Sequence, residues 1–160
     1  MAASVRIHFI NFPMKRISLI ISLLVLVSSS FAQENKRTIV TTDGEIDDVD
    51  TFLRFLLYTN EFDTEGLIYS SSMWHWKGDD KGTTMVSEME MTRNIYGERS
   101  ELRWPGTTWM QELLADYAKV HPNLLLHDEN YPSAEALLAL VKVGNIDFEG
   151  EMDKRTEGSE

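Results

Sequence analysis

The sequence predicts an α/β fold, an open parallel sheet with flanking helices, and three neighbouring patterns predict it. A β-rich run begins at Thr38, an amphipathic pattern follows the acidic residues 43–50, and a second apolar run occupies residues 67–69. A strand, a helix and a strand within about thirty residues form a βαβ unit, whose strands lie parallel. Such units bind ligands outside the carboxyl ends of their strands. The acidic segment after the first strand is therefore the first candidate for function.

The helix of this unit is predicted from the spacing of its apolar residues. They recur at i, i+3, i+4, i+7 and i+8, a pattern that gives a helix one apolar face. The residues are Val49, Phe52, Leu53, Leu56 and Leu57. We expect this face to be buried.

Three further helices are expected along the chain. One covers residues 83–96 with imperfect periodicity and leads into a turn at 97–100, and a more regular one covers residues 107–120. Ser133 can cap a short third helix that ends near Val141. Only two strands are convincing, and two strands cannot form the sheet that a βαβ unit begins. We therefore expect the fold to be incomplete in this chain, as the N-terminal part of a longer domain.

The N-terminus has the features of a secretory signal peptide. Lys15 and Arg16 precede an apolar run over residues 17–27, and residues 30–32 supply small side chains at the cleavage site. The apolar run is too short to span a bilayer comfortably. We expect residues 1–32 to be removed and residues 33–160 to be exported to the periplasm or the extracellular space, with no membrane attachment afterwards.

Composition excludes some functions. The formal net charge is −11, and removal of the signal peptide, which holds three basic and no acidic residues, lowers it to −14. Nucleic-acid binding is therefore not expected, because phosphate contacts need a basic surface. The chain has no cysteine, so no disulfide framework forms, although an exported compartment would permit one.

Five carboxylates crowd the turn after the first strand: Asp43, Glu45, Asp47, Asp48 and Asp50. Like charges at this density repel one another unless a cation, a proton or hydrogen-bond donors neutralise them. Oxygen ligands of this kind suit calcium or magnesium. A solvated acidic turn that complements a helix N-terminus is the alternative, and spacing alone leaves both open.

Two segments carry a resemblance to a known family. The pattern Asp43-x-x-x-Asp47-Asp48 resembles half of the D-x-D-x-x-x-D-D signature of calcium-dependent nucleoside hydrolases, the inosine/uridine-preferring superfamily. The amino-acid sequence of residues 41–78 and 141–153 resembles the secreted bacterial nucleoside hydrolase-like family that is labelled cellulose-binding. The likeness runs from about Arg37 to the end of the chain and implies that family's open parallel sheet.

The resemblance also implies roles for three aspartates. The residue that matches Asp43 contacts calcium and acts as general base, the one that matches Asp47 hydrogen-bonds ribose hydroxyls, and the one that matches Asp48 is a bidentate calcium ligand. This chemistry is coherent, because a metal lowers the pKa of its bound water and a carboxylate can then take the proton. The family's later calcium ligands and leaving-group acid lie beyond residue 160, so we expect this chain alone to be inactive.

The sequence departs from the hydrolase pattern at several positions. Thr41 stands where the signature begins with aspartate, and Gly44 and Glu45 replace the usual Pro-Gly. After the second strand, residues 70–76 replace a Gly-Asn pair that lies near the substrate. The resemblance therefore implies a different sugar pocket.

Trp74, His75 and Trp76 follow the second strand and are candidates for substrate binding. Aromatic faces stack on sugars or bases, and histidine exchanges protons near neutral pH. Alternatively, both tryptophans pack in the core and His75 is exposed. Trp104 is either a second sugar platform or part of a Pro-Gly turn, and residues 145–151 are expected to form a solvated acidic loop.

Two function classes remain. The first is a calcium-dependent N-glycosyl (ribosyl) hydrolase that acts on a nucleoside or related glycoside when full length, with Asp43 as its base. The second is a secreted binder of cellulose or another polysaccharide, which holds the glycan with Trp74 and Trp76 on an inactive hydrolase-like fold. Both imply a small-molecule or carbohydrate ligand, and association of copies of the chain is left open.

Overall fold

The computed structural model describes residues 35–149 and 155–159. The predicted signal peptide, residues 1–32, lies outside these described residues. None of the helices in the described part of the chain is long and apolar enough to cross a membrane.

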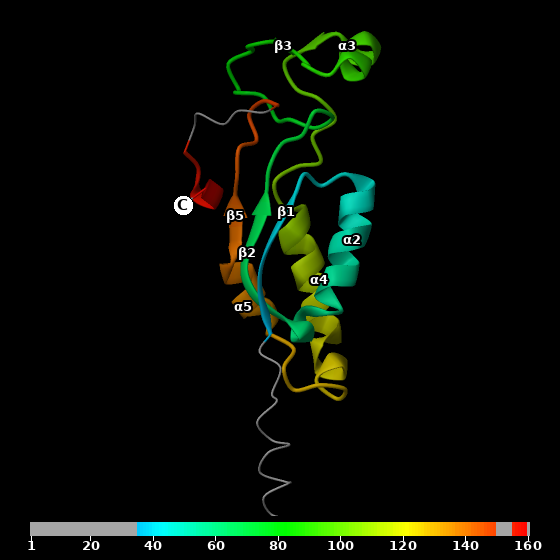
Figure 1. The fold of residues 1–160 in the computed structure, drawn as a ribbon, viewed down its shortest axis with the longest axis vertical. Coiled ribbons are helices and arrows are strands. Elements are labelled where there is room, and N and C mark those ends of the chain that lie inside the picture. The colour runs from blue at the N-terminus through cyan, green and yellow to red at the C-terminus, as the bar shows by residue number, and fades with distance from the viewer. Residues whose placement is uncertain (1–34, 150–154, 160) are drawn as a thin grey trace, which may run out of the picture. The chain divides into compact units, whose positions relative to one another are not determined.

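The βαβ unit predicted from the sequence forms the centre of the fold. Strand β1 (Lys36–Thr42) leads through helix α2 (Ile46–Leu56) and the short helix η1 (Thr59–Glu61) into strand β2 (Phe62–Tyr69), which pairs with β1 in parallel. A third parallel strand, β5 (Val141–Val143), pairs with the other edge of β2, so the strand order is β1-β2-β5 (Figure 1). The α/β class with a parallel sheet and flanking helices is confirmed.

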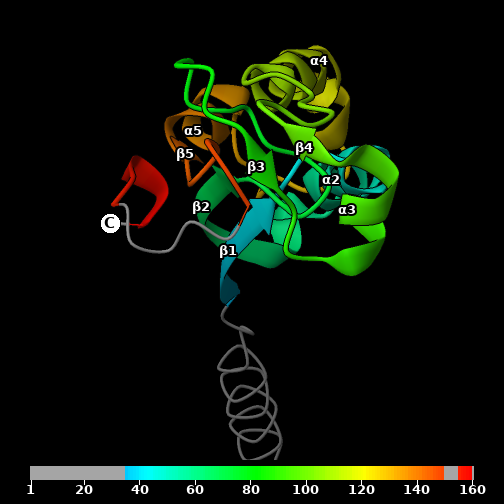
Figure 2. The same ribbon diagram turned by 90° about the horizontal axis from the view of Figure 1, so that it is seen from above.

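Two longer helices lie on one side of this sheet. Helix α4 (Trp109–Leu124) and α2 are on the same side in both views (Figure 1, Figure 2), and α5 (Ala134–Ala139) contacts α4. The remaining elements are short: β3 (Met85–Val86), α3 (Glu90–Tyr96), β4 (Glu98–Arg99) and η2 (Glu157–Ser159). The elements β3 and α3 lie beyond the end to which the arrows of β2 and β5 point (Figure 1).

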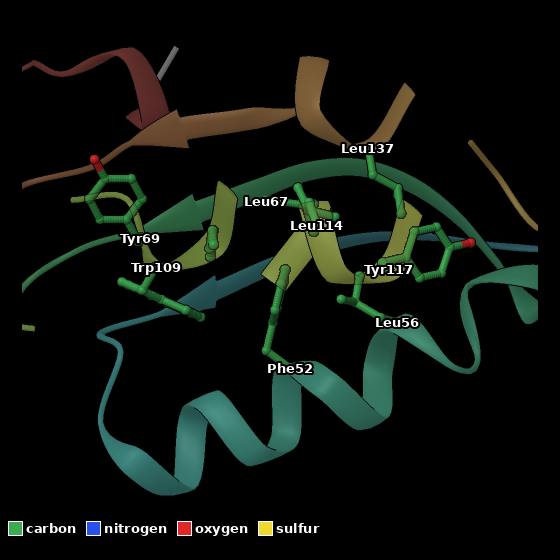
Figure 3. Packing of buried hydrophobic residues seen from close by; sticks show 9 residues of the cluster. Phe52, Leu56, Leu67, Tyr69, Trp109, Leu114, Tyr117 and Leu137 are labelled. Carbon is green, nitrogen blue, oxygen red and sulfur yellow. The ribbon is translucent and has the colours of Figure 1, made fainter. Parts of the chain in front are cut away.

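The core lies between the sheet and these helices. Phe52 of α2 meets Trp109 of α4 edge to face, with ring centroids 5.5 Å apart. Figure 3 shows the side chains of α2 and α4 turned toward one another beneath β2. The buried cluster consists of Phe52, Leu56, Leu67, Tyr69, Trp109, Met110, Leu114, Tyr117 and Leu137. This packing fixes α2, and with it the acidic turn, relative to β2.

The buried face of α2 is narrower than its sequence pattern predicted. Phe52 and Leu56 are each 2% exposed, whereas Leu53 and Leu57 are 40% and 49% exposed. The prediction was wrong for these two residues: Phe52 and Leu56 belong to the core cluster and Val49 packs against it, whereas Leu53 and Leu57 do neither. Leu53 and Leu57 instead line a shallow groove with Val120 of α4.

Two other predictions about elements were wrong in part. The expected helix over residues 83–96 begins only at Glu90, because Met85 and Val86 pair as β3 with β4, where a turn was expected. The helix capped by Ser133 ends at Ala139, and Val141 begins strand β5. Both strands depend on partners distant in the sequence, which local periodicity does not detect.

Candidate functional site

Three loops meet at the carboxyl end of the sheet. They follow β1 (residues 43–45), β2 (residues 70–78) and β5 (residues 144–149). The N–H of Ser71 donates to the carbonyl of Asn145 over 2.6 Å, and the Ser71 hydroxyl donates to the carbonyl of Phe148 over 2.7 Å. These bonds join the second and third loops into one edge. This is the end at which α/β sheets bind their ligands.

The loop after β5 is not the solvated acidic loop that the sequence predicted. Its described residues, 145–149, are all half-buried. The N–H groups of Lys77 and Gly78 each donate over 2.8 Å to its carbonyls, those of Ile146 and Asp147. The loop therefore supports the segment that carries His75.

The turn after β1 is shaped by a glycine. Gly44 has φ +76°, which favours glycine, and a Cβ there would lie 2.7 Å from Trp109 Nε1 and 2.9 Å from Pro105 Cγ. The Glu45 N–H donates to Asp43 Oδ1 over 3.2 Å. A glycine thus lets the turn pack directly against the start of α4. The hydrogen bond from the Glu45 N–H holds the Asp43 carboxylate against the turn.

Asp43 and Asp48 form an interacting pair. The Asp43 N–H donates to Asp48 Oδ2 over 3.1 Å. Burial acts to raise the pKa of Asp43, but hydrogen bonds to Asp48, Ser72 and the Glu45 N–H outweigh it, with a contribution from His75, and lower the pKa overall. The hydrogen bond with Asp43 raises the pKa of Asp48, and burial adds to that rise. Asp43 is therefore the carboxyl group of the pair that ionises first.

His75 is buried beside this turn. It is 4% exposed, so the alternative in which it faces solvent is wrong. Its backbone is fixed by paired bonds with Ser72, the N–H of Ser72 donating to its carbonyl over 2.9 Å and its own N–H donating back over 3.3 Å. Its Nδ1 has no hydrogen-bond partner among the described residues.

That nitrogen faces two carboxylates. His75 Nδ1 lies 3.2 Å from Glu45 Oε1 and 3.6 Å from Asp43 Oδ2. One ligand atom of each residue lies within 4.8 Å of the others, which makes the three side chains a candidate metal centre within the described chain. Arg103 Nη1 approaches Glu45 Oε1 to 4.0 Å from the more exposed side.

The other predicted aspartates lie differently. Asp48 is not part of this group, since its carboxylate holds the backbone of Asp43. Asp47 is exposed on the first turn of α2. The structure thus brings Asp43 together with His75 and adds Glu45, whose pairing the sequence did not predict. The sequence had shown Glu45 only as one of the five carboxylates that crowd this turn.

The tryptophans separate into two environments. Trp76 is 0% exposed, so it cannot stack on a ligand and is withdrawn from the predicted ligand-binding residues. Trp74 is half-buried and meets Tyr96 edge to face, with centroids 6.3 Å apart. Trp104 is half-buried against Tyr69 at 6.4 Å. Trp74 and Trp104 each keep part of their surface exposed.

Comparison with known proteins gives one finding about family. The family model described as "Cellulose-binding Sde182, nucleoside hydrolase-like domain" matches residues 37–160. No match is found among curated proteins or among solved structures. The matched region includes all three loops of the carboxyl edge.

Proposed function

We propose that the protein expressed from the natural gene of this chain, which belongs to the family of cellulose-binding Sde182, nucleoside hydrolase-like domains, hydrolyses an N-glycosyl bond to ribose or a related sugar at the carboxyl edge of its sheet. Asp43 is the general base. The observation that carries the proposal is the position of Asp43, which is a half-buried carboxylate with a lowered pKa at the edge where α/β folds bind ligands.

In the proposed reaction Asp43 accepts a proton from a water molecule. The oxygen of that water bonds to the anomeric carbon, and the carbon–nitrogen bond breaks with its electron pair going to the leaving base. The leaving base takes up a proton from solvent and Asp43 afterwards releases its proton to solvent, so the net reaction consumes one water. A positioned general base of this kind contributes about 10²–10⁴-fold to a rate.

Other residues of the edge would hold the sugar. Asp47 is exposed on the first turn of α2 and offers a carboxylate to sugar hydroxyls. Trp74 offers the exposed part of its ring for stacking. Asp48, which bonds the Asp43 backbone, keeps the base oriented.

A divalent cation would lower the pKa of the attacking water. Asp43 and Glu45 are the carboxylates that could hold it beside His75. The family resemblance implies calcium. Calcium takes six to eight oxygen ligands, and the nitrogen of His75 in the middle of the donor group does not fit that preference.

The same proposal includes export. The signal-peptide pattern of residues 1–32 and the cellulose-binding label of the family both support a location outside the cytoplasm.

Carbohydrate binding without hydrolysis is the second candidate, and the family label favours it. Trp74 and Trp104, both half-buried beside the carboxyl edge, would then contact the glycan. Such a binder needs the aromatic rings and does not need the Asp43 carboxylate.

Two assays on the protein expressed from its natural gene separate the candidates. The first measures ribose release from a panel of nucleosides, and the second measures co-sedimentation with insoluble cellulose. Asp43→Asn tests the base, with the exposed Asp50→Asn on α2 as its control. Trp74→Ala tests the platform, with the neighbouring exposed Met73→Ala as its control.

Hydrolysis predicts ribose release that falls at least about 10²-fold in Asp43→Asn and is unchanged in Asp50→Asn. Binding alone predicts no release and a loss of sedimentation in Trp74→Ala but not in Asp43→Asn. Ribose release that is equal in Asp43→Asn and the wild type would reject the hydrolase mechanism.

A further inference from the structure

The possible metal ligands at the carboxyl edge include a nitrogen, His75 Nδ1. Its presence favours some metal ions over others. We infer that Asp43, Glu45 and His75 form a site for a divalent transition-metal ion of the zinc type, and not for calcium. The inference rests on the proposed function only in that both place a cation at Asp43. It is tested by metal binding, which does not depend on turnover.

Burial of His75 is the first support. The side chain is 4% exposed, yet its Nδ1 has no hydrogen-bond partner among the described residues. Leaving a buried polar atom unpaired costs about 1–3 kcal/mol. A metal bond from Nδ1 would remove that cost. The nitrogen faces Asp43 and Glu45, so the missing partner belongs between the three side chains.

The spacing of the donor atoms is the second support. Ligands bonded to zinc at 2.0–2.1 Å in a tetrahedron lie about 3.3 Å apart. His75 Nδ1 lies 3.2 Å from Glu45 Oε1 and 3.6 Å from Asp43 Oδ2. One ligand atom from each of the three residues lies within 4.8 Å of the other two. Only a small movement of the Asp43 and Glu45 carboxylates is needed to close a three-ligand site.

The donor types decide between metals. Imidazole suits zinc, copper, iron and nickel, whereas calcium and magnesium favour carboxylate, carbonyl and water oxygens. Three protein ligands and one open position are the arrangement of catalytic zinc sites. Calcium would need several more oxygens than Asp43 and Glu45 provide.

The surroundings suit such a site. Asp48 Oδ2 accepts from the backbone N–H of Asp43 over 3.1 Å and so helps to fix the position of this ligand. Arg103 is 4.0 Å from Glu45 and about half-exposed. It can turn away into solvent when Glu45 binds the ion.

Metal binding to the untagged, metal-free protein tests the inference. Zn²⁺, Co²⁺ and Ca²⁺ are titrated separately by calorimetry, and the visible spectrum of the Co²⁺ complex reports coordination geometry. His75→Gln and Glu45→Gln remove ligands. The controls are His127→Gln, at an exposed histidine, and Asp50→Asn, at an exposed aspartate.

We expect Zn²⁺ and Co²⁺ to bind at least tenfold more tightly than Ca²⁺, with one ion per chain and a four-coordinate Co²⁺ spectrum. His75→Gln and Glu45→Gln should each weaken Zn²⁺ binding by about 10–100-fold or more, the range found even for residues that only orient a ligand. The two controls should bind as the wild type does. If His75→Gln fails to fold, the partly exposed Glu45→Gln decides the outcome.

Tighter binding of Ca²⁺ than of Zn²⁺ would overturn the inference. So would the absence of binding for all three ions, or an equal loss of Zn²⁺ affinity in His127→Gln and His75→Gln. Zinc binding without any ribose release would retain the metal site and count against the hydrolase proposal, so the two can fail separately.

Discussion

Gly44 determines how closely the first loop approaches α4. Its φ of +76° and the 2.7 Å approach of a would-be Cβ to Trp109 Nε1 both exclude other residues. Gly82 has a similar φ of +79° but no atom within 4 Å of its would-be Cβ. Comparing the same substitution at Gly44 and at Gly82 therefore separates the cost of backbone strain from the cost of a steric clash.

We predict that Gly44→Ala destabilises the protein more than Gly82→Ala does. Both substitutions strain the backbone, at a cost of about 1–2 kcal/mol, and Gly44→Ala adds a clash that costs about 1–3 kcal/mol. Urea denaturation gives the two free energies of unfolding. An equal loss in both variants would show that the turn does not pack on Trp109.

A second prediction concerns the two carboxyl groups of Asp43 and Asp48. In the metal-free protein, the pKa of Asp43 should lie below that of an ordinary aspartate and the pKa of Asp48 above it. As the pH falls, Asp48 should therefore take up its proton first. Carbon-detected NMR of the side-chain carboxyls measures both titrations. The reverse order would contradict the hydrogen-bonded arrangement of the turn.

Helix α5 directly precedes β5 in the chain and contributes one residue to the core cluster. Leu137 is 0% exposed and belongs to the core cluster, whereas the next residue, Leu138, is 47% exposed. The Ser133 hydroxyl caps this helix by accepting from the Ala136 N–H over 3.1 Å, as the sequence predicted. A six-residue helix depends on such tertiary contacts for its stability.

We predict that Leu137→Ala lowers the free energy of unfolding by about 2–5 kcal/mol. Leu138→Ala removes the same atoms from the same helix and should change it by about 0.5 kcal/mol or less. Chemical denaturation compares them directly. Similar losses would mean that Leu137 of α5 does not lie in the core cluster.

Sequence patterns predicted the elements whose signals are local. Strand β1, the apolar periodicity of α2 and the Ser133 cap are each encoded within a few residues. Strand β5 was missed because three residues carry no periodicity, and its pairing with Leu67–Tyr69 joins distant segments. The antiparallel pair β3–β4 was missed for the same reason.

The candidate site, too, could be predicted only where its features are local in the sequence. The acidic turn was visible because Asp43, Glu45 and Asp48 are close in sequence. The burial of His75 depends on its pairing with Ser72 and on the bridge between Trp76 and Leu102, a long-range contact. Proximity of His75 to Glu45 therefore could not be predicted from spacing.

At the scale of the whole molecule, metal binding should stabilise the fold. A ligand that binds only the folded state at 100 times its Kd adds about 2.7 kcal/mol of stability. We predict that saturating Zn²⁺ raises Tm, that chelation by EDTA reverses the rise, and that His127→Gln retains it while His75→Gln loses it. Differential scanning calorimetry provides the measurement. A rise of the same size in His75→Gln would indicate binding elsewhere on this acidic chain, whose formal net charge is −11.

Ribose release by the protein expressed from its natural gene and by its Asp43→Asn variant, measured side by side with added Zn²⁺ or Ca²⁺, tests the central claim most directly. The account predicts release by the wild type and a loss of at least about 10²-fold in Asp43→Asn. Release that persists in the folded Asp43→Asn protein would contradict it, because the carboxyl-edge aspartate would then not be the base.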